Sequence, residues 1–111
     1  NLACLLQEKN DPRALDLAKR AYLLQPGQAT ADTLGWILIR NGDPEKGLEL
    51  LRQAAAGQTS PQIAYHLAVA LKDTGKQDEA VKLLTALTKP EVKFDEKPQA
   101  EKLLSDLTKK G

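Results

Sequence analysis

Apolar residues and glycine recur along this chain at an interval of 33 residues, and this repeat constrains the fold more than any other feature of the sequence. The positions Leu34, Leu38, Gly42, Leu48 and Leu51 recur as Leu67, Leu71, Gly75, Val81 and Leu84. An earlier copy begins at Leu2 with an offset of 32 residues, so its inter-helix turn is one residue shorter. A unit of this length cannot bury its apolar face alone, so successive units are expected to stack on one another.

Each unit has the apolar spacing of two helices. Leu34, Ile37 and Leu38 follow the i, i+3, i+4 spacing of one helix face, and Leu48 and Leu51 continue it after a turn. Aromatic residues make up only 4% of the chain, so the interior must be built from Leu, Ala, Ile and Val, as is usual in packed helices. Helices are expected at residues 1–9, 12–24, 29–41, 44–56, 61–74, 77–88 and 97–109.

Capping signals support these boundaries. The pairs Asp11-Pro12, Asp43-Pro44 and Ser60-Pro61 each place a capping side chain before a proline at the first helical position. The missing N–H of proline costs nothing there, and its fixed φ already suits a helix. Gly27, Gly42 and Gly75 follow three of the helices, where a left-handed backbone conformation is expected.

The overall charge and composition exclude several classes of protein. The 16 Lys and Arg residues against 15 Asp and Glu leave a net charge of +1, which lacks the basic footprint of a nucleic-acid binder. No apolar run approaches the roughly 18 residues of a membrane span, so we expect no nucleic acid partner and no insertion of this segment into a membrane. The single Cys4 cannot form an internal disulfide, and it indicates no particular compartment.

Small residues occupy the positions where the two helices of a unit are expected to cross, because Gly or Ala lets two helix backbones approach closely. The second unit has Leu34-Gly35, Leu38, Gly42-Asp43, Gly47, Leu51 and Ala54, and the third has Leu67-Ala68, Leu71, Gly75, Ala80, Leu84 and Leu87. This pattern resembles the tetratricopeptide repeat. The resemblance implies an all-α fold, a right-handed α-solenoid of antiparallel helix pairs with a C-terminal capping helix. The implied units are 1–27, which is truncated, 28–60 and 61–93, followed by a connection and the capping helix at 94–111.

A narrower resemblance concerns the run DTLGWILIRNGDPEKGLELLRQA, the later segment YHLAVALKDTGKQDEA and a terminal AEKLLSDL helix. Together they are similar to the C-terminal end of bacterial tetratricopeptide lipoproteins of exopolysaccharide and PEP-CTERM protein-sorting systems. The chain begins without Met, within an expected helix, so we expect a C-terminal piece of a longer bacterial protein. This resemblance implies an envelope location and a lipid-bearing cysteine upstream of Cys4; without it, a cytoplasmic location is equally open.

In arrays of this family the first helix of each unit lines the concave surface. The residues of these helices that lie outside the packing stripe predict a partner-binding patch of Asp32, Trp36, Ile39, Arg40, Tyr65, His66, Val69 and Lys72. The 33-residue step should bring Asp32 near Tyr65 and Trp36 near Val69. An aromatic anchor with apolar walls and a polar rim is typical of a protein-binding or peptide-binding site. The alternative is that Trp36, the only tryptophan, simply packs in the core.

No arrangement of residues indicates catalysis. His66 is the only histidine and Cys4 the only cysteine, and neither a phosphate-binding glycine loop nor a metal-ligand spacing is present. We therefore expect a non-enzymatic scaffold for protein–protein interaction that needs no cofactor and no metal. The carboxylate clamp of chaperone-binding relatives is absent, because its Lys, Asn and Arg are replaced by residues such as Asp32, Trp36 and His66. The alternative function is a purely structural cap whose upstream repeats bind the partner.

Overall fold

The computed structural model describes residues 13–56 and 60–109. Within these residues the chain forms six helices and no strand. The helices are α2 (Arg13–Leu24), α3 (Gln28–Arg40), α4 (Pro44–Ala55), α5 (Pro61–Asp73), α6 (Gln77–Leu87) and α7 (Lys97–Thr108). The expected helix at 1–9 and Cys4 lie outside the described residues.

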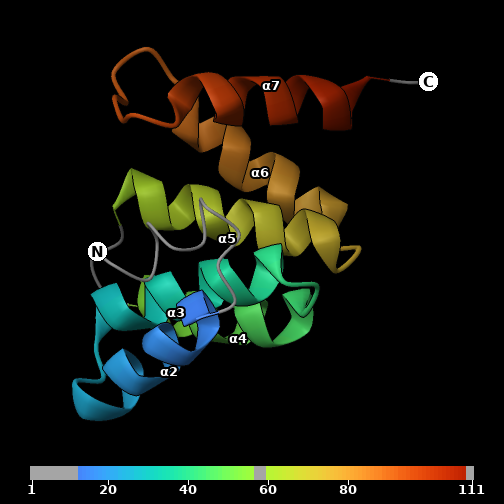
Figure 1. Cartoon of the computed structure of the whole chain (residues 1–111). Helices are drawn as coiled ribbons and strands as arrows, with labels where there is room; N and C mark the ends of the chain where they lie inside the picture. Colours follow the sequence, from blue (N-terminus) through green and yellow to red (C-terminus); the bar gives the residue numbers. More distant parts are fainter. Residues whose placement is uncertain (1–12, 57–59, 110–111) are drawn as a thin grey trace.

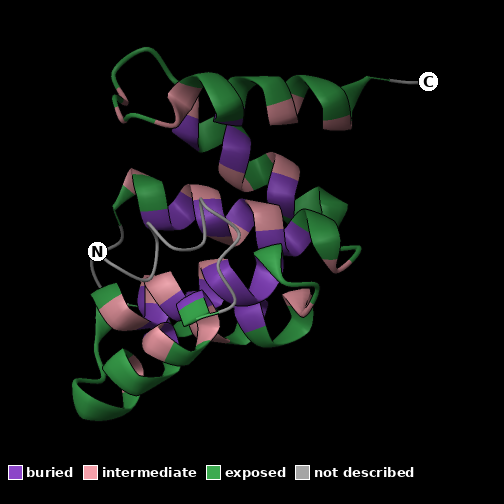
Figure 2. Cartoon of the chain, in the orientation of Figure 1, coloured by how far each residue is buried: buried purple, intermediate pink, exposed green. Residues whose placement is uncertain are grey.

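Each helix packs on the next one in the chain, and α3 also contacts α5. The helices are stacked in chain order from α2 to α7 (Figure 1). The buried faces of α3, α4, α5 and α6 turn toward one another, whereas most of α7 is exposed (Figure 2). The largest fully buried side chains are those of Ile37, Leu51 and Leu84, one each from α3, α4 and α6. The fold is therefore all-α and consists of antiparallel helix pairs, as expected from the sequence.

Two of the predicted capping devices are confirmed. The side chain of Asp43 accepts a hydrogen bond from the backbone N–H of Lys46 at the start of α4, at 3.5 Å. The Ser60 hydroxyl accepts one from the N–H of Ile63 at the start of α5, at 3.2 Å. Both helices have proline in the first turn. These local signals explain why the predicted boundaries of the described helices agree with the structure to within about one residue.

The three glycines predicted to end helices behave differently. Gly42 and Gly75 have φ of 87° and 82°, so both adopt the left-handed conformation that was predicted. The prediction for Gly27 is wrong, because its φ is 177° and it is the N-cap residue of α3. Helix α2 already ends at Leu24, and Gln25 and Pro26 make the turn before Gly27.

Backbone contact between α3 and α4 occurs at two glycines. A Cβ added to Gly47 would lie 2.6 Å from the carbonyl oxygen of Gly35, and one added to Gly35 would lie 3.0 Å from the carbonyl oxygen of Gly47. The 2.6 Å distance is shorter than real Cβ contacts, so a side chain at Gly47 would displace the backbone, and the 3.0 Å distance at Gly35 is tighter than most such contacts. The prediction that small residues allow close helix crossing is confirmed at this pair.

Helix α7 covers the end of the stack. Ala100 is fully buried against Ala68 and Leu84, with Phe94 packed beside them. The connection from α6 is tied to the start of α7, because the Lys97 amine donates hydrogen bonds to the carbonyl oxygens of Lys89, at 2.8 Å, and Val92, at 2.6 Å. Exposed polar residues lie on the rest of α7, including Glu101, Lys102, Ser105 and Asp106. Helix α7 therefore has one packed side and one solvated side.

Candidate functional site

An aromatic stack lies between α3 and α5. The Trp36 ring of α3 is stacked on the His66 ring of α5, with 4.1 Å between the ring centroids and 22° between the planes. Tyr65 lies at 6.2 Å from Trp36 in a tilted arrangement. Trp36 and Tyr65 remain partly accessible, whereas His66 is buried at 7% exposure. Trp36 is thus neither fully core nor freely exposed.

Asp32 positions the histidine of this stack. Its Oδ1 lies 2.7 Å from His66 Nδ1, and the two side chains are 15% and 8% exposed. An ionised carboxylate can only accept hydrogen bonds, so Nδ1 carries the proton that is donated. Asp32 precedes Trp36 by one helical turn, and the two side chains therefore share a face of α3. Both reach the same histidine.

Arg40 contacts the stack from the other end of α3. The guanidinium carbon lies 5.7 Å from the centroid of the Trp36 ring, within the range of a cation–π interaction. Arg40 is exposed and is the last residue of α3. A cation next to an indole that is already stacked on imidazole limits the rotamers open to Trp36.

Tyr65 connects the stack to the segment before α7. Burial is the largest cause that raises the pKa of the Tyr65 hydroxyl, the nearby Glu96 carboxylate raises this pKa further, and the Arg40 guanidinium lowers it. Glu96 also accepts a hydrogen bond from the Gln62 side-chain amide, at 2.9 Å. Tyr65 packs against the cluster that holds Ala100 of α7. The aromatic stack is therefore supported from α3, α5 and α7.

A cavity of about 340 Å³ opens beside Trp36, at the N-terminal ends of α3 and α5. It is lined by Gln28, Ala29, Asp32, Thr33, Trp36, Ser60, Gln62, Ile63 and His66. Among the described residues of this lining, Asp32 is the only Asp or Glu, and none is Lys or Arg. Gln28, Ser60 and Gln62 are not among the binding residues predicted from the sequence. The 33-residue step pairs Ala29 with Gln62, so the repeat carried a signal for one of them.

Six of the eight residues predicted for the partner-binding patch are exposed or partly exposed. A seventh, His66, is buried but lines the cavity. Val69 is partly buried and packs, like Trp36, against the cluster that contains Leu71. Lys72 is exposed and its amine lies 3.2 Å from the Asp73 carboxylate on the same helix. We refer to Asp32, Trp36, Arg40, Tyr65, His66, Val69 and Lys72 as the α3–α5 surface.

The expectation for Ile39 is corrected by its burial. Ile39 is 7% exposed and belongs to a core cluster with Leu48, Leu51 and Ala80. Its side chain lies against Gly47, where a Cβ on the glycine would come within 2.7 Å of Ile39 Cγ1. Helix α3 packs on α2, α4 and α5 at once, so it has a wider buried face than a single stripe. For this reason Ile39 is not part of the α3–α5 surface.

The hydrogen-bonded pair between α3 and α5 is shifted by one residue from the repeat. Asp32 bonds to His66, 34 residues away, which is the neighbour of its repeat equivalent Tyr65. The repeat length gives equivalent positions in two units, whereas contacting positions also depend on how far neighbouring helices are rotated and shifted. Trp36, which precedes His66 by 30 residues, stacks on the same imidazole ring.

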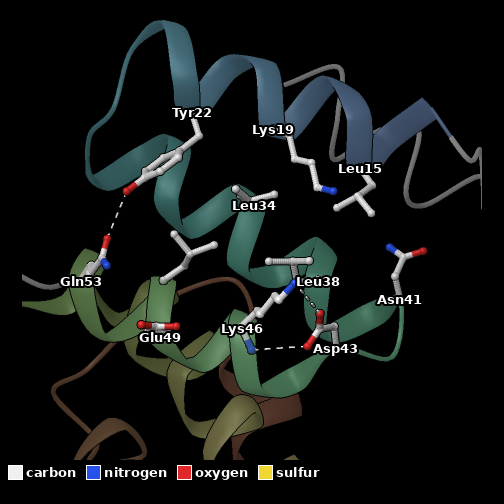
Figure 3. Close-up of a pocket in the computed structure, with 11 residues that line it drawn as sticks. Leu15, Lys19, Tyr22, Leu34, Leu38, Asn41, Asp43, Lys46, Glu49 and Gln53 are labelled. Carbon is white, nitrogen blue, oxygen red and sulfur yellow. Dashed lines mark hydrogen bonds and ion pairs between the residues drawn. The ribbon is translucent and has the colours of Figure 1, made fainter.

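A second cavity, of about 640 Å³, lies between α2, α3 and α4 (Figure 3). Leucine side chains from these helices line it, namely Leu15, Leu34, Leu38 and Leu50. A hydrogen bond of 3.1 Å from the Tyr22 hydroxyl to Gln53 crosses one end, and Lys46 lies 3.9 Å from Asp43 at the other (Figure 3). Its charged residues are of both signs, Lys19 and Lys46 against Asp43 and Glu49, so the lining favours no particular ligand charge.

The described part of the chain contains no cluster of three or more His, Cys, Asp or Glu side chains that could hold a metal ion. No helix in it has the length and apolar character that a membrane crossing requires.

Comparison with known proteins gives one family match. A family model described as tetratricopeptide repeat matches residues 38–107, more than half of the chain. The match runs from the end of α3 into α7. No curated protein and no solved structure matches the chain.

Proposed function

Because the chain belongs to the tetratricopeptide repeat family, we propose that it is a non-enzymatic scaffold that binds a segment of another protein on the α3–α5 surface. Repeats of this family generally bind proteins or peptides. The observation that carries the proposal is the stack of Trp36 on His66, which stays partly accessible beside a cavity. Tryptophan is rarely fully buried even where it packs on a core, so the cavity beside the ring, and not its partial exposure alone, favours a binding role.

The chemistry of the α3–α5 surface supports binding of a polypeptide. Trp, Tyr and Arg are the residue types that most often dominate the binding energy of protein interfaces, and Trp36, Tyr65 and Arg40 lie together here. Polar side chains such as Gln62 and Ser60 lie at the edge of the cavity, where a peptide backbone needs hydrogen-bond partners. The arrangement suits an apolar anchor with polar flanks.

The proposed mechanism is static presentation. His66 is held by Asp32 at 2.7 Å and by the stacked indole at 4.1 Å, so the ring pair has few alternative positions. A preorganised surface loses less side-chain entropy when a ligand binds. The bound segment would therefore lie across side chains that are already in place, with little change in the backbone of either helix.

The proposal is tested with Trp36 as both reporter and target. Peptides are selected from a random displayed library on the whole chain, and their binding is measured by the emission of the only tryptophan. Binding to a Trp36→Ala variant is then measured by fluorescence anisotropy of a labelled peptide. We expect Trp36→Ala to abolish binding and Tyr22→Ala, an aromatic truncation on α2, to leave it within about twofold. Undiminished binding to a folded Trp36→Ala variant would overturn the proposal.

The alternative function is a structural cap for repeats outside this segment, and the solvated outer side of α7 favours it. The same variants separate the two. A loss of roughly 3–5 kcal/mol in the free energy of unfolding for Trp36→Ala, with no selected peptide, would mark Trp36 as core and support the cap.

A finer version of the proposal places the whole gene product in exopolysaccharide or PEP-CTERM protein export as a bacterial envelope lipoprotein. It rests on the resemblance of residues 32–54, 65–80 and 100–107 alone. Mass spectrometry of the intact gene product from its host tests it, because a lipoprotein must carry the mass of its acyl chains. A full-length product without lipid would reject it and would leave the scaffold proposal unaffected.

A further inference from the structure

We propose that the cavity beside Trp36 accepts a lysine or arginine side chain of the bound segment, with Asp32 as its charged partner. This inference rests on the proposed function and specifies the chemistry of the ligand. It concerns the end of the α3–α5 surface where α3 and α5 begin, and not the aromatic stack as a whole.

The charged residues at the cavity favour a cationic ligand. Among the nine described residues that line the cavity, Asp32 is the only Asp or Glu and none is Lys or Arg. A second carboxylate, that of Glu96, is bonded to the cavity residue Gln62 at 2.9 Å. The Arg40 guanidinium lies 5.7 Å from the Trp36 ring but is not part of the lining. The charge carried by the described lining itself is therefore negative, and a cation is the complementary ligand.

The Asp32 carboxylate is largely buried and has acceptor positions left for a ligand. Its side chain is only 15% exposed, so the charge is screened by little water. The bond from His66 uses one of the roughly four acceptor positions of a carboxylate, which leaves acceptor capacity for a ligand. An ammonium or guanidinium group that donates to this carboxylate would form a charge-assisted hydrogen bond, the stronger class of hydrogen bond in proteins.

The size and lining of the cavity suit a long basic side chain. Its volume of about 340 Å³ is near the lower end of ligand pockets, which suits one long side chain with its adjoining backbone. Trp36 lines the cavity together with Asp32, so the methylene groups of a lysine or arginine can pack on the indole while the charged end reaches the carboxylate. An acidic side chain would meet Asp32, and the part of the lining that the structure describes holds no Lys or Arg to offset the repulsion.

The test compares selected peptides on three forms of the whole chain. Random peptides are selected on the wild-type chain, on Asp32→Asn and on Asp78→Asn, which removes the same charge from an exposed position of α6. Asparagine at position 32 still offers an oxygen to the His66 N–H, so the stack can be retained, and circular dichroism checks the folding of each variant. We expect peptides selected on the wild-type chain to be enriched in lysine or arginine at one position. Their affinity should fall about tenfold or more on Asp32→Asn and stay within about twofold on Asp78→Asn.

A substitution in the peptide, combined with Asp32→Asn in the chain, gives a double-mutant cycle. An arginine peptide and its citrulline counterpart, which has nearly the same shape without the charge, are titrated against wild type and Asp32→Asn. We expect citrulline to weaken binding to the wild-type chain about tenfold and to have little further effect on Asp32→Asn. If Trp36-dependent peptides show no preference for a basic residue, or if citrulline costs as much on Asp32→Asn, this inference is overturned while the proposed function stands. If no peptide binds through Trp36, both this inference and the proposed function are overturned.

Discussion

Asp32 and His66 are separated by 34 residues in the chain, yet Oδ1 of one lies 2.7 Å from Nδ1 of the other, and this hydrogen bond joins α3 to α5. Both side chains are largely buried, at 15% and 8% exposure. The bond therefore has a structural role in addition to the binding role that we propose, because it fixes the ring on which Trp36 is stacked.

We expect His66→Ala to lower the free energy of unfolding by about 1–3 kcal/mol, because it leaves the Asp32 carboxylate without its imidazole donor. Loss of the stacked ring should also shift Trp36 emission to longer wavelength, since water reaches the indole. Urea unfolding followed by circular dichroism measures the first effect and fluorescence the second. In the double variant Asp32→Asn/His66→Ala part of the loss should be recovered. A change of less than about 0.5 kcal/mol for His66→Ala would show that the bond contributes little to stability.

We expect Gly47→Ala to destabilise the chain by about 1–3 kcal/mol through overpacking. The new methyl group would lie 2.6 Å from the Gly35 carbonyl oxygen and 2.7 Å from Ile39 Cγ1, so α3 and α4 must move apart. Gly27→Ala is the matched control, because no atom lies within 4 Å of the added Cβ and its φ of 177° suits any residue. Thermal unfolding of the two variants compares them; equal midpoints would contradict the close crossing.

We expect the stability of the chain to fall as the pH rises above 10.0, with part of this fall due to Tyr65. Burial raises the pKa of the Tyr65 hydroxyl above its usual 10.0, so the folded chain keeps a proton that the unfolded chain loses there. The unfolded state then binds fewer protons, and the free energy of unfolding decreases with pH. Urea unfolding from pH 8 to pH 11 should show a smaller decrease for Tyr65→Phe than for the wild-type chain. Parallel curves would exclude a contribution from Tyr65.

We expect Ser60→Ala to cost about 1 kcal/mol, because the Ile63 N–H loses the hydroxyl that caps α5 at 3.2 Å. Ser60→Asp should restore most of this stability, since aspartate is also a good N-cap residue and its charge favours a helix N-terminus. Chemical denaturation measures both changes. A Ser60→Ala variant as stable as the wild-type chain would show that Pro61 alone is enough to start the helix.

The sequence allowed prediction of the helices and their ends because these depend on local signals. Proline after a capping residue starts α4 and α5, and Gly42 and Gly75 end α3 and α5 through a left-handed backbone that other residues rarely adopt. The prediction for Gly27 was wrong because glycine is found both after the end of a helix and at an N-cap. The short connection between α2 and α3 places Gly27 at the N-cap of α3.

The candidate site could be predicted only in part, since it depends on the relative placement of helices. The repeat placed Asp32, Trp36 and His66 on one surface, but the repeat length does not specify that Asp32 and Trp36 both contact His66, which lies 34 and 30 residues further along the chain. Ile39 was misplaced because the packing of α3 on three neighbours cannot be read from its own periodicity. The cavity of about 640 Å³ between α2 and α4 was missed because it reflects the sizes of side chains that meet across helices.

The double role of His66 limits how the α3–α5 surface can be re-engineered. Its ring is at once a buried packing element at 7% exposure and the support of the accessible indole. Libraries that vary the exposed positions Arg40, Gln62 and Lys72 can therefore change ligand preference at little cost in folding. Randomisation of Asp32, Trp36 or His66 would confound lost affinity with lost fold, so selection for a new specificity should keep these three residues constant.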